Sequence, residues 1–407
     1  NLKMVADNRT TLEWSRVMVW RLFSILAVSL GLSVVKPSPI EAQSSKSSLA
    51  LLEELTNAHG PSGFEGPVRK IMRREWAGLV SNLETDGMGN LLGTLKGTAE
   101  GPRVLLMAHM DEVGFIVRFI DDDGFIYFNP VGGYFDQSIL TQQMKIMTPK
   151  GPVIGYTGMK SGHSFQGDER NQMVELRDVF LDIGARSRLE AEDLFGIRPG
   201  LPITYDADFR DLNGTGRYLA KAWDDRAGLA AITEVLQRLQ DRSHPNTVVV
   251  AATTQEEISG RRGASVVYES LKPDIVLNLE IGVASDFPLL TSPKEAQGQL
   301  GGGPSLFVFD GSMLPNQKLI EWIMEVAERN GIDYQFESVS GYGEDASVLQ
   351  RSGRGIPAIN LGITTRYAHS QLGVVELTDY EKMVDLIHVL VMGLTEEQAS
   401  AIRDFDS

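Results

Sequence analysis

Short, mainly apolar runs alternate with helix-type patterns along most of the chain. The runs lie at residues 104–108, 247–252, 274–279 and 358–361. Continuous runs of this kind are typical of strands that are buried on both faces of a parallel sheet. Helical periodicity occupies residues 227–240, 316–330 and 379–394. Strands that alternate with helices predict an α/β fold with a mixed, mostly parallel sheet sandwiched by helices.

The remaining patterns predict how this fold is divided. Helix patterns at 49–58 and 67–78 follow a polar linker at 44–48. Residues 128–212 are rich in Gly and Pro and contain short alternating stretches, which indicate a small β-barrel domain inserted into the α/β domain. We therefore expect an N-terminal extension with a signal peptide, a first catalytic part, the inserted β domain and a second catalytic part. Their expected bounds are 1–43, 44–127, 128–212 and 213–407.

The N-terminal region has the order of a secretory signal peptide. Arg16 and Arg21 precede an apolar run at 22–35, and a stretch of small residues leads to Ala42. The alternative is an uncleaved membrane anchor, but the run is about 14 residues long and roughly 20 are needed to span a bilayer. We expect a start at Met18, cleavage near Ala42, export to the periplasm or the medium, and no stable membrane anchor after processing.

Charge and composition exclude several classes of partner and chemistry. The formal net charge of −16 argues against nucleic acid or an anionic membrane as the main partner, because both attract basic surfaces. The chain contains no cysteine, which excludes disulfides, thiolate metal sites and cysteine nucleophiles. Any transition metal must therefore be held by His, Asp and Glu.

Candidate ligand side chains follow the apolar runs or begin an adjacent helix, where functional groups gather in open α/β sheets. They are His109, Asp111, Asp224, Asp225, Glu256, Glu257, Glu280 and His369. Taken singly, each has an ordinary structural interpretation, such as a surface carboxylate or a carboxylate at a helix N-terminus. Taken together, two histidines and three carboxylates suit a pair of divalent metal ions.

Neighbouring candidates have separable roles. Residues i and i+2 of an extended segment face the same side, so Asp111 can support His109. The adjacent acids Glu256 and Glu257 point in different directions, so one can bind metal while the other faces a substrate. In the pair Asp224 and Asp225, one acid can cap the following helix while the other faces the site.

Several motifs occur in a known order. They are AHMDEVG, KAWDDRAG, TTQEE followed by RRGA, and RYAHS, together with PSGFEG, DGMGNLLG and GEDASVLQRSGRGIPAINLGI. Over roughly residues 49–395 the chain resembles the tetrahedral aminopeptidase family, a two-metal exopeptidase group of the same clan as the zinc aminopeptidases, with a phosphorylase-like fold. The family includes glutamyl and leucyl aminopeptidases and members that have been labelled endoglucanases.

The resemblance implies a function and a role for each site residue. The implied activity is removal of N-terminal residues from peptides by a hydroxide that bridges two metals, zinc or cobalt, with manganese also compatible. The implied metal ligands are His109, Asp224, Glu257, Glu280 and His369. The implied catalytic residues are Glu256, as general base, and Asp111, which orients His109. The resemblance also implies a homo-oligomer, a dodecamer in the family, with the inserted domain contributing dimer contacts.

Three departures from the family pattern bear on this site. Glu280 stands where the family usually has Asp. Residues 258–264 hold one residue more than the family pattern, and the spacing from Glu257 to Glu280 is longer by the same one residue. His369 is followed by Ser-Gln-Leu-Gly instead of Ser-Pro and a glutamate, so the glutamate that usually supports this histidine is missing.

Two alternatives stay open: a two-metal amidohydrolase that acts on N-acyl amino acids, and a scaffold or binding homologue without turnover. A sugar hydrolase would use two acids without metal, and the histidines argue against it.

Overall fold

The computed structural model describes residues 39–98, 100–290 and 297–406, with side chains from Ser48 onward. The chain divides into two compact units, residues 1–43 and 44–407, and the fold below is that of the second unit. The apolar run at 22–35 lies outside the described residues. Among the helices that are described, none is long and apolar enough to cross a membrane.

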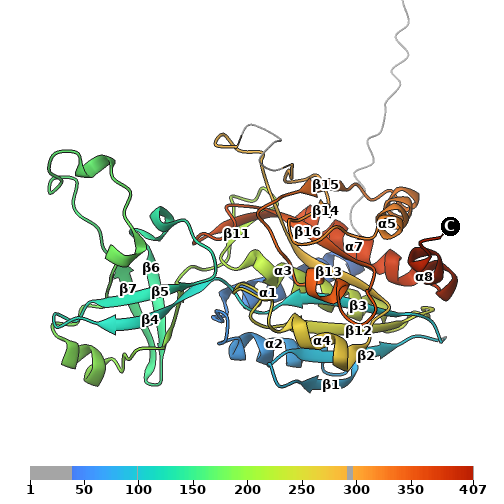
Figure 1. Ribbon diagram of the computed structural model, residues 1–407, viewed down its shortest axis with the longest axis horizontal. Coiled ribbons are helices and arrows are strands. Elements are labelled where there is room, and N and C mark those ends of the chain that lie inside the picture. The colour runs from blue at the N-terminus through green and yellow to red at the C-terminus, as the bar shows by residue number, and fades with distance from the viewer. Residues whose placement is uncertain (1–38, 99, 291–296, 407) are drawn as a thin grey trace, which may run out of the picture. The chain divides into compact units, whose positions relative to one another are not determined.

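A mixed sheet of eleven strands forms the centre of the α/β part within the described residues. Its order is β1-β2-β12-β3-β13-β16-β17-β11-β10, with β14 paired to β16 and β15 paired to β14 (Figure 1). The central neighbours β12, β3, β13 and β16 run parallel, and β15 is parallel to β14, whereas the other pairs are antiparallel. The strands are β1 (Ser81–Thr85), β2 (Leu91–Lys96), β3 (Arg103–His109), β10 (Arg210–Asp211), β11 (Arg217–Ala220), β12 (Thr247–Thr253), β13 (Ile275–Val283), β14 (Ser305–Phe309), β15 (Gln335–Ser338), β16 (Ala358–Arg366) and β17 (Gly373–Glu376).

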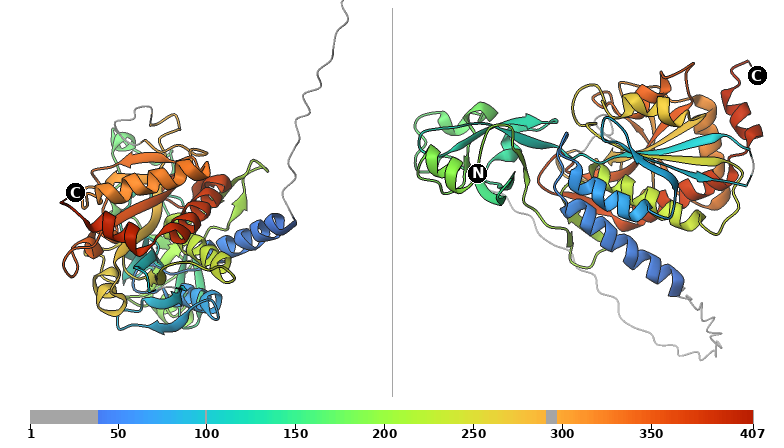
Figure 2. Two further views of the ribbon diagram at one scale, coloured as in Figure 1. Left: turned by 90° about the vertical axis from the view of Figure 1, so that its right-hand side faces the viewer. Right: turned by 90° about the horizontal axis from the view of Figure 1, so that it is seen from below.

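Helices cover both faces of this sheet, as Figure 2 shows (right). In β3, Val104 and Leu106 belong to a cluster that contains α2, α3 and α7, whereas Leu105 and Met107 belong to a cluster that contains α4 and α6. Both sides of the strand are therefore apolar, which confirms the sandwiched sheet predicted from the uninterrupted runs. The helices are α1 (Pro39–Asn57), α2 (Gly66–Trp76), α3 (Trp223–Leu239), α4 (Ala264–Leu271), α5 (Gln317–Asn330), α6 (Ala346–Gln350), α7 (Leu377–Gly393) and α8 (Glu396–Arg403).

The backbone at residues 44–48 differs from the expected linker, because it belongs to helix α1. Serine and lysine carry no apolar periodicity, so the pattern did not reveal this part of the helix.

Six further strands form a closed barrel in the order β4-β5-β8-β7-β6-β9 within the described residues. They are β4 (Gly114–Ile120), β5 (Ile126–Val131), β6 (Gln143–Thr148), β7 (Gly151–Thr157), β8 (Leu181–Asp182) and β9 (Pro202–Tyr205). Short helices accompany them: η1 (Asp136–Ile139), η2 (Glu169–Asn171), η3 (Leu176–Asp178) and η4 (Glu190–Leu194). The inserted β-barrel was predicted, but it begins at Gly114 and not at residue 128. The apolar run of β4 resembles a strand of the main sheet, and periodicity alone does not tell the two apart.

The parallel strands bring their carboxyl ends to one edge of the sheet. Thr253 of β12 pairs with His109 of β3 in the parallel register. Strand β13 continues past the predicted run to Val283, because β16 pairs with it from Val276↔Ala358 to Val283↔Thr365. Glu280 therefore lies inside a strand and not after its end, and it is 2% exposed.

Candidate metal centre

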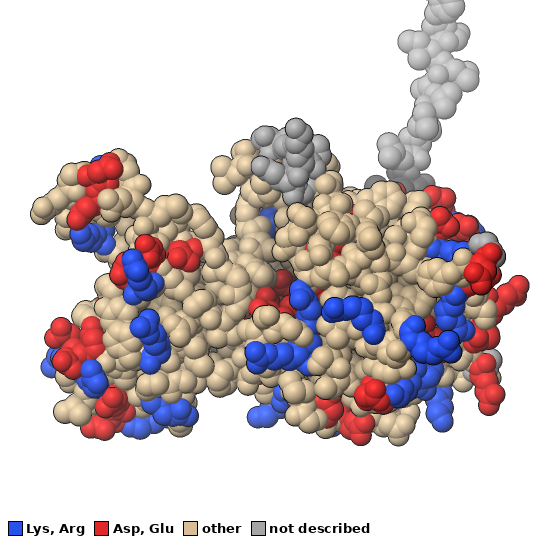
Figure 3. All heavy atoms as spheres, viewed as in Figure 1, with Lys and Arg blue, Asp and Glu red and all other residues tan. Residues whose placement is uncertain are grey.

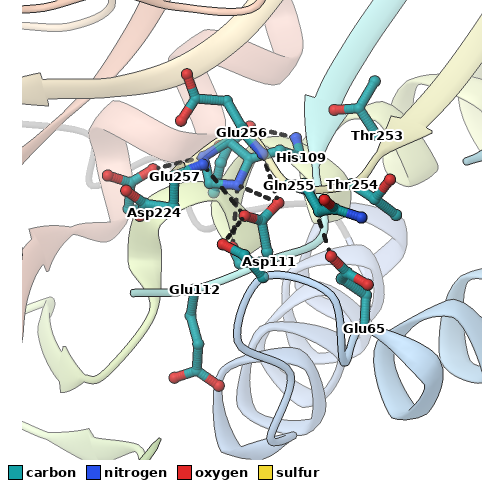
Figure 4. Close-up of polar contacts among 12 residues, drawn as sticks. Glu65, His109, Asp111, Glu112, Asp224, Thr253, Thr254, Gln255, Glu256 and Glu257 are labelled. Atoms are coloured by element: carbon teal, nitrogen blue, oxygen red, sulfur yellow. Dashed lines mark hydrogen bonds and ion pairs between the residues drawn. The ribbon is translucent and has the colours of Figure 1, made fainter. Parts of the chain in front are cut away.

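Asp224 lies between the two predicted histidine ligands. Its Oδ1 is 2.9 Å from Nε2 of His109, and its Oδ2 is 3.1 Å from Nε2 of His369. Figure 4 shows Asp224 and His109 side by side. One carboxylate that presents one oxygen toward each of two imidazoles has the arrangement of a bridging ligand for two cations.

The acidic pair that begins α3 divides its roles as expected. Asp224 and Asp225 have non-helical backbone angles within the element's bounds. Asp225 Oδ1 accepts the backbone N–H of Gly228 across 3.0 Å, so this carboxylate caps the helix. Its Oδ2 accepts the backbone N–H of His109 across 3.3 Å, which ties the helix to the end of β3. Asp224 is thereby left to face the histidines.

The predicted support of His109 by Asp111 takes an unexpected form. Nδ1 of His109 is 3.0 Å from the backbone carbonyl oxygen of Asp111, and the Asp111 carboxylate is farther away at 3.6 Å. A ring N–H that donates to this carbonyl leaves Nε2 free to bind a metal. The Asp111 carboxylate instead accepts the backbone N–H groups of Glu256 and Glu257, both across 3.1 Å (Figure 4).

The other acids complete two sides of the centre. Glu257 Oε2 is 3.3 Å from Nε2 of His369, and Glu280 Oε2 is 3.8 Å from Nε2 of His109. Nδ1 of His369 lies 3.0 Å from the backbone oxygen of Gly133. This carbonyl gives His369 a hydrogen-bond partner in place of the family's missing glutamate.

All five predicted metal ligands thus come together, and their chemistry fits divalent cations. Ligand atoms lie within 4.8 Å of one another in three groups: His109 with Asp225 and Glu280, His109 with Asp224 and Glu257, and Glu256 with Glu280 and Glu344. Among the described residues, the buried atoms Glu256 Oε1 and Glu257 Oε1 have no hydrogen-bond partner. Buried carboxylate oxygens without a partner are costly unless a cation offsets them.

The pKa values of these groups reflect a surplus of negative charge. Burial, followed by the charges of Glu344 and Asp225, raises the pKa of Glu280 well above its ordinary value. Burial also raises the pKa of Glu256 well above its ordinary value, although His109 opposes this shift. Burial would raise the pKa of Asp224 too, but its hydrogen bonds to the two histidines hold that pKa below the usual range. Bound cations would favour the ionised form of all these acids.

Two acids of the centre were not predicted from the sequence. Glu344 and Asp345 lie between β15 and α6 and are 5% and 0% exposed. Burial raises the pKa of Glu344 to about 8 and that of Asp345 to about 6. They follow no apolar run, so the strand-end rule did not find them. The one local signal was two adjacent acids directly before a short helical pattern.

The centre opens into a pocket of about 630 Å³. Asp224, Glu256, Glu257, Glu280 and His369 contribute to its wall, whereas His109 lies beneath them and is 1% exposed. Apolar side chains of Phe287 and Leu290 line another part of the same wall. On the molecular face drawn in Figure 3, acidic and basic side chains are interspersed.

The fold and this centre define a metal-dependent hydrolase. A family model described as M42 glutamyl aminopeptidase matches residues 89–386, and a model described as AMPT matches residues 46–72. The chain belongs to the M42 glutamyl aminopeptidase family. It is a metallo-aminopeptidase of that family, an enzyme class that removes N-terminal residues, and this confirms the family and enzyme class predicted from the motifs.

Curated relatives and solved structures agree with this assignment. FrvX of Escherichia coli K12 is 35% identical over 88% of this chain and 98% of its own length. Glutamyl aminopeptidase of Lactococcus lactis is 31% identical over 87% and 98%. A TET aminopeptidase from a marine sediment thaumarchaeon has 37% identity and a TM-score of 0.85, covering 88% of this chain and 99% of that one. PhTET1-12s, a dodecamer, has 30% identity and a TM-score of 0.75 over 85% and 99%.

Proposed function

We propose that this chain is a two-metal aminopeptidase whose cations are held by His109, Asp224, Glu257, Glu280 and His369. The observation that carries the proposal is the Asp224 carboxylate, which directs one oxygen to each histidine. Glu280 stands near His109 and Glu257 near His369, so each side has an imidazole, a shared carboxylate and a further carboxylate. Zinc, cobalt and manganese are compatible with such ligands.

Glu256 is the proposed general base. When bound, two divalent cations lower the pKa of a coordinated water and polarise the scissile carbonyl. Glu256 lies in the pocket wall, has a buried Oε1 without a hydrogen-bond partner among the described residues, and is held in place through its backbone by Asp111. It accepts a proton from the attacking water and donates it to the leaving amine. The acidic wall of the pocket attracts the positively charged N-terminus of a peptide.

Hydrolysis of a peptide with a free N-terminus tests this function. The wild-type enzyme is expected to release the first residue, to lose activity after chelation, and to recover it when divalent metal is restored. Glu256→Gln is expected to lower kcat by about 10²-fold to 10⁴-fold while the protein keeps its metal. Activity that survives both chelation and Glu256→Gln would exclude the scheme.

The same assay separates the two alternatives. An N-acetylated copy of the peptide should resist an aminopeptidase, whereas an N-acyl amino acid amidohydrolase would prefer the acetylated form. A binding homologue would hydrolyse neither, and elemental analysis would find less than about one metal ion per chain.

Assembly and export are further parts of the proposal. The relative PhTET1-12s is a dodecamer, and the barrel of this chain exposes Phe135, Tyr156 and Met173 at 62%, 50% and 63%. Exposed apolar side chains of this size support self-association, so we propose a homo-oligomer, which light scattering of the purified protein would test.

The signal-type sequence before Ala42 supports export. N-terminal sequencing of the secreted protein should begin just after Ala42, and a start at Met18 would exclude cleavage.

A further inference from the structure

Glu344 lies against the Glu280 side of the metal centre, outside the ligand set proposed above. Carboxyl oxygens of Glu256, Glu280 and Glu344 lie within 4.8 Å of one another. Glu344 is 5% exposed, so it is withdrawn from solvent with the others. Ionised carboxylates this close repel one another, and a cation between them removes that repulsion.

An independent observation indicates that a cation belongs among these three acids. The side chain of Glu256 is 9% exposed, and its Oε1 has no hydrogen-bond partner among the described residues. Arg261 forms an ion pair with Glu256, and its Nε is 3.5 Å from that oxygen. One guanidinium at this distance does not offset three buried carboxylates, because each ionised acid costs several kcal/mol to desolvate.

Surrounding contacts fix Glu344 and Glu280 in this position. Asp345, the next residue after Glu344, accepts the hydroxyl of Thr253 at the end of β12 across 2.6 Å. On the other side, Asn278 of β13 donates to Glu280 across 3.4 Å and to Asn360 of β16 across 3.0 Å. Asparagine side chains inside two buried parallel strands are unusual, and here Asn278 connects Glu280 to Asn360 of the neighbouring strand.

We propose that Glu344 is a metal-binding residue that acts together with Glu280. The cation on the His109 side then has one imidazole and an excess of carboxylates. Carboxylates suit Mn²⁺, whereas imidazole suits Zn²⁺, so the extra carboxylate gives this side the higher Mn²⁺ affinity of the two. The inference rests on the two-metal centre proposed above and adds to it a ligand and a metal preference.

Direct Mn²⁺ titration of the metal-free protein, followed by electron paramagnetic resonance of unbound Mn²⁺, tests the proposal. Wild-type protein is expected to bind two Mn²⁺ per chain. Glu344→Gln should weaken one of the two sites by about tenfold or more, with a smaller loss of Zn²⁺ affinity. Glu337→Gln is a matched control, because Glu337 is also buried but contacts the backbone N–H of Val283 across 2.6 Å instead of the acidic group. Two unchanged Mn²⁺ sites in Glu344→Gln would overturn the proposal.

A second measurement does not depend on the folding of a variant. In a crystal of the wild-type protein soaked with Mn²⁺, anomalous scattering should place an ion roughly 2.0–2.6 Å from a Glu344 oxygen, a normal distance for a hard cation. An ion on the His109 side without Glu344 in contact would overturn the proposal. The proposed function is judged separately: an inactive wild-type enzyme whose Mn²⁺ binding depends on Glu344 would refute the aminopeptidase activity and leave this metal site standing.

Discussion

The Asp111 carboxylate holds the backbone of Glu256, whose N–H donates to Asp111 Oδ1 across 3.1 Å. Oδ2 of Asp111 accepts the N–H of Glu257 across 3.1 Å and the hydroxyl of Ser62 across 2.6 Å. One buried side chain therefore sets the position of both the proposed base and a proposed metal ligand. Asp111 acts on the reaction through the loop that it anchors, and it is a positioning residue.

Asp111→Asn is expected to displace that loop without removing the support of His109. An amide offers one acceptor oxygen where the carboxylate offers two, so one of the two N–H groups loses its acceptor. Misplacement of a catalytic group by about 1 Å costs about 10²-fold in rate. Steady-state kinetics should show a fall of that order in kcat with little change in KM, and elemental analysis should find both metals.

Ser62→Ala provides the control for this variant. It removes one donor to Asp111 but leaves both acceptor oxygens for Glu256 and Glu257. Its loss of kcat should be clearly smaller than that of Asp111→Asn. Equal losses in the two variants would mean that the hydroxyl contact, and not the loop, accounts for the effect.

Metal removal is expected to destabilise the folded protein as well as to stop turnover. The centre crowds buried carboxylates around two histidines, and a cation that binds only the native state stabilises it by mass action. The gain is about 4 kcal/mol at a free metal concentration of 1,000 times Kd. Thermal unfolding with and without chelator should therefore show a lower Tm without metal, and an unchanged Tm would argue that the centre binds no cation tightly.

A buried ion pair supports the loop that leads to this centre. Lys221 Nζ lies 2.8 Å from both carboxylate oxygens of Glu112, and the two side chains are 2% and 4% exposed. Glu112 also accepts the backbone N–H of Gly60 across 3.0 Å. Lys221 directly follows strand β11, so the pair connects the end of that strand to the segment before Ser62.

Lys221→Met should destabilise the protein by about 3 kcal/mol or more, because it leaves the Glu112 carboxylate buried without its main partner. The double variant Lys221→Met/Glu112→Gln should recover part of this loss, since the buried carboxylate is gone and Arg226, which lies 3.6 Å from it, keeps the backbone carbonyls of Leu55 and Gly60 as partners. Denaturant unfolding of both variants measures the difference. A double variant less stable than Lys221→Met alone would contradict the explanation.

The sequence predicted which side chains lie near one another where local patterns encode their position. The runs at β3 and β12 are apolar on both faces, so His109, Glu256 and Glu257 could be placed at strand ends before any contact was known. Glu344 could not be found in this way, because it lies in a loop that has no periodic burial. The support of His369 was also inaccessible, since the carbonyl of Gly133 is 236 residues away along the chain and belongs to no side-chain pattern.

Glu337 gives the protein a stability that depends on pH. Its Oε1 accepts the backbone N–H of Val283 across 2.6 Å, and its buried Oε2 has no hydrogen-bond partner among the described residues. Burial raises the pKa of Glu337 from 4.5 to about 7. Because the folded state holds the proton more tightly than the unfolded state, this contribution to stability is fully present below pH 4.5 and is lost as pH rises through 7.

Glu337→Gln keeps a neutral side chain of the same shape at every pH, so it should abolish this dependence. A shift from 4.5 to about 7 corresponds to about 3 kcal/mol. Relative to the wild-type protein, the variant should gain up to that amount of stability between pH 4.5 and pH 8. Urea unfolding of both metal-free proteins at the two pH values measures this difference in unfolding free energy. The other titrating groups contribute equally to the variant and to the wild type, so they cancel. A constant difference between variant and wild type across this range would mean that Glu337 ionises as easily in the folded protein as in the unfolded chain.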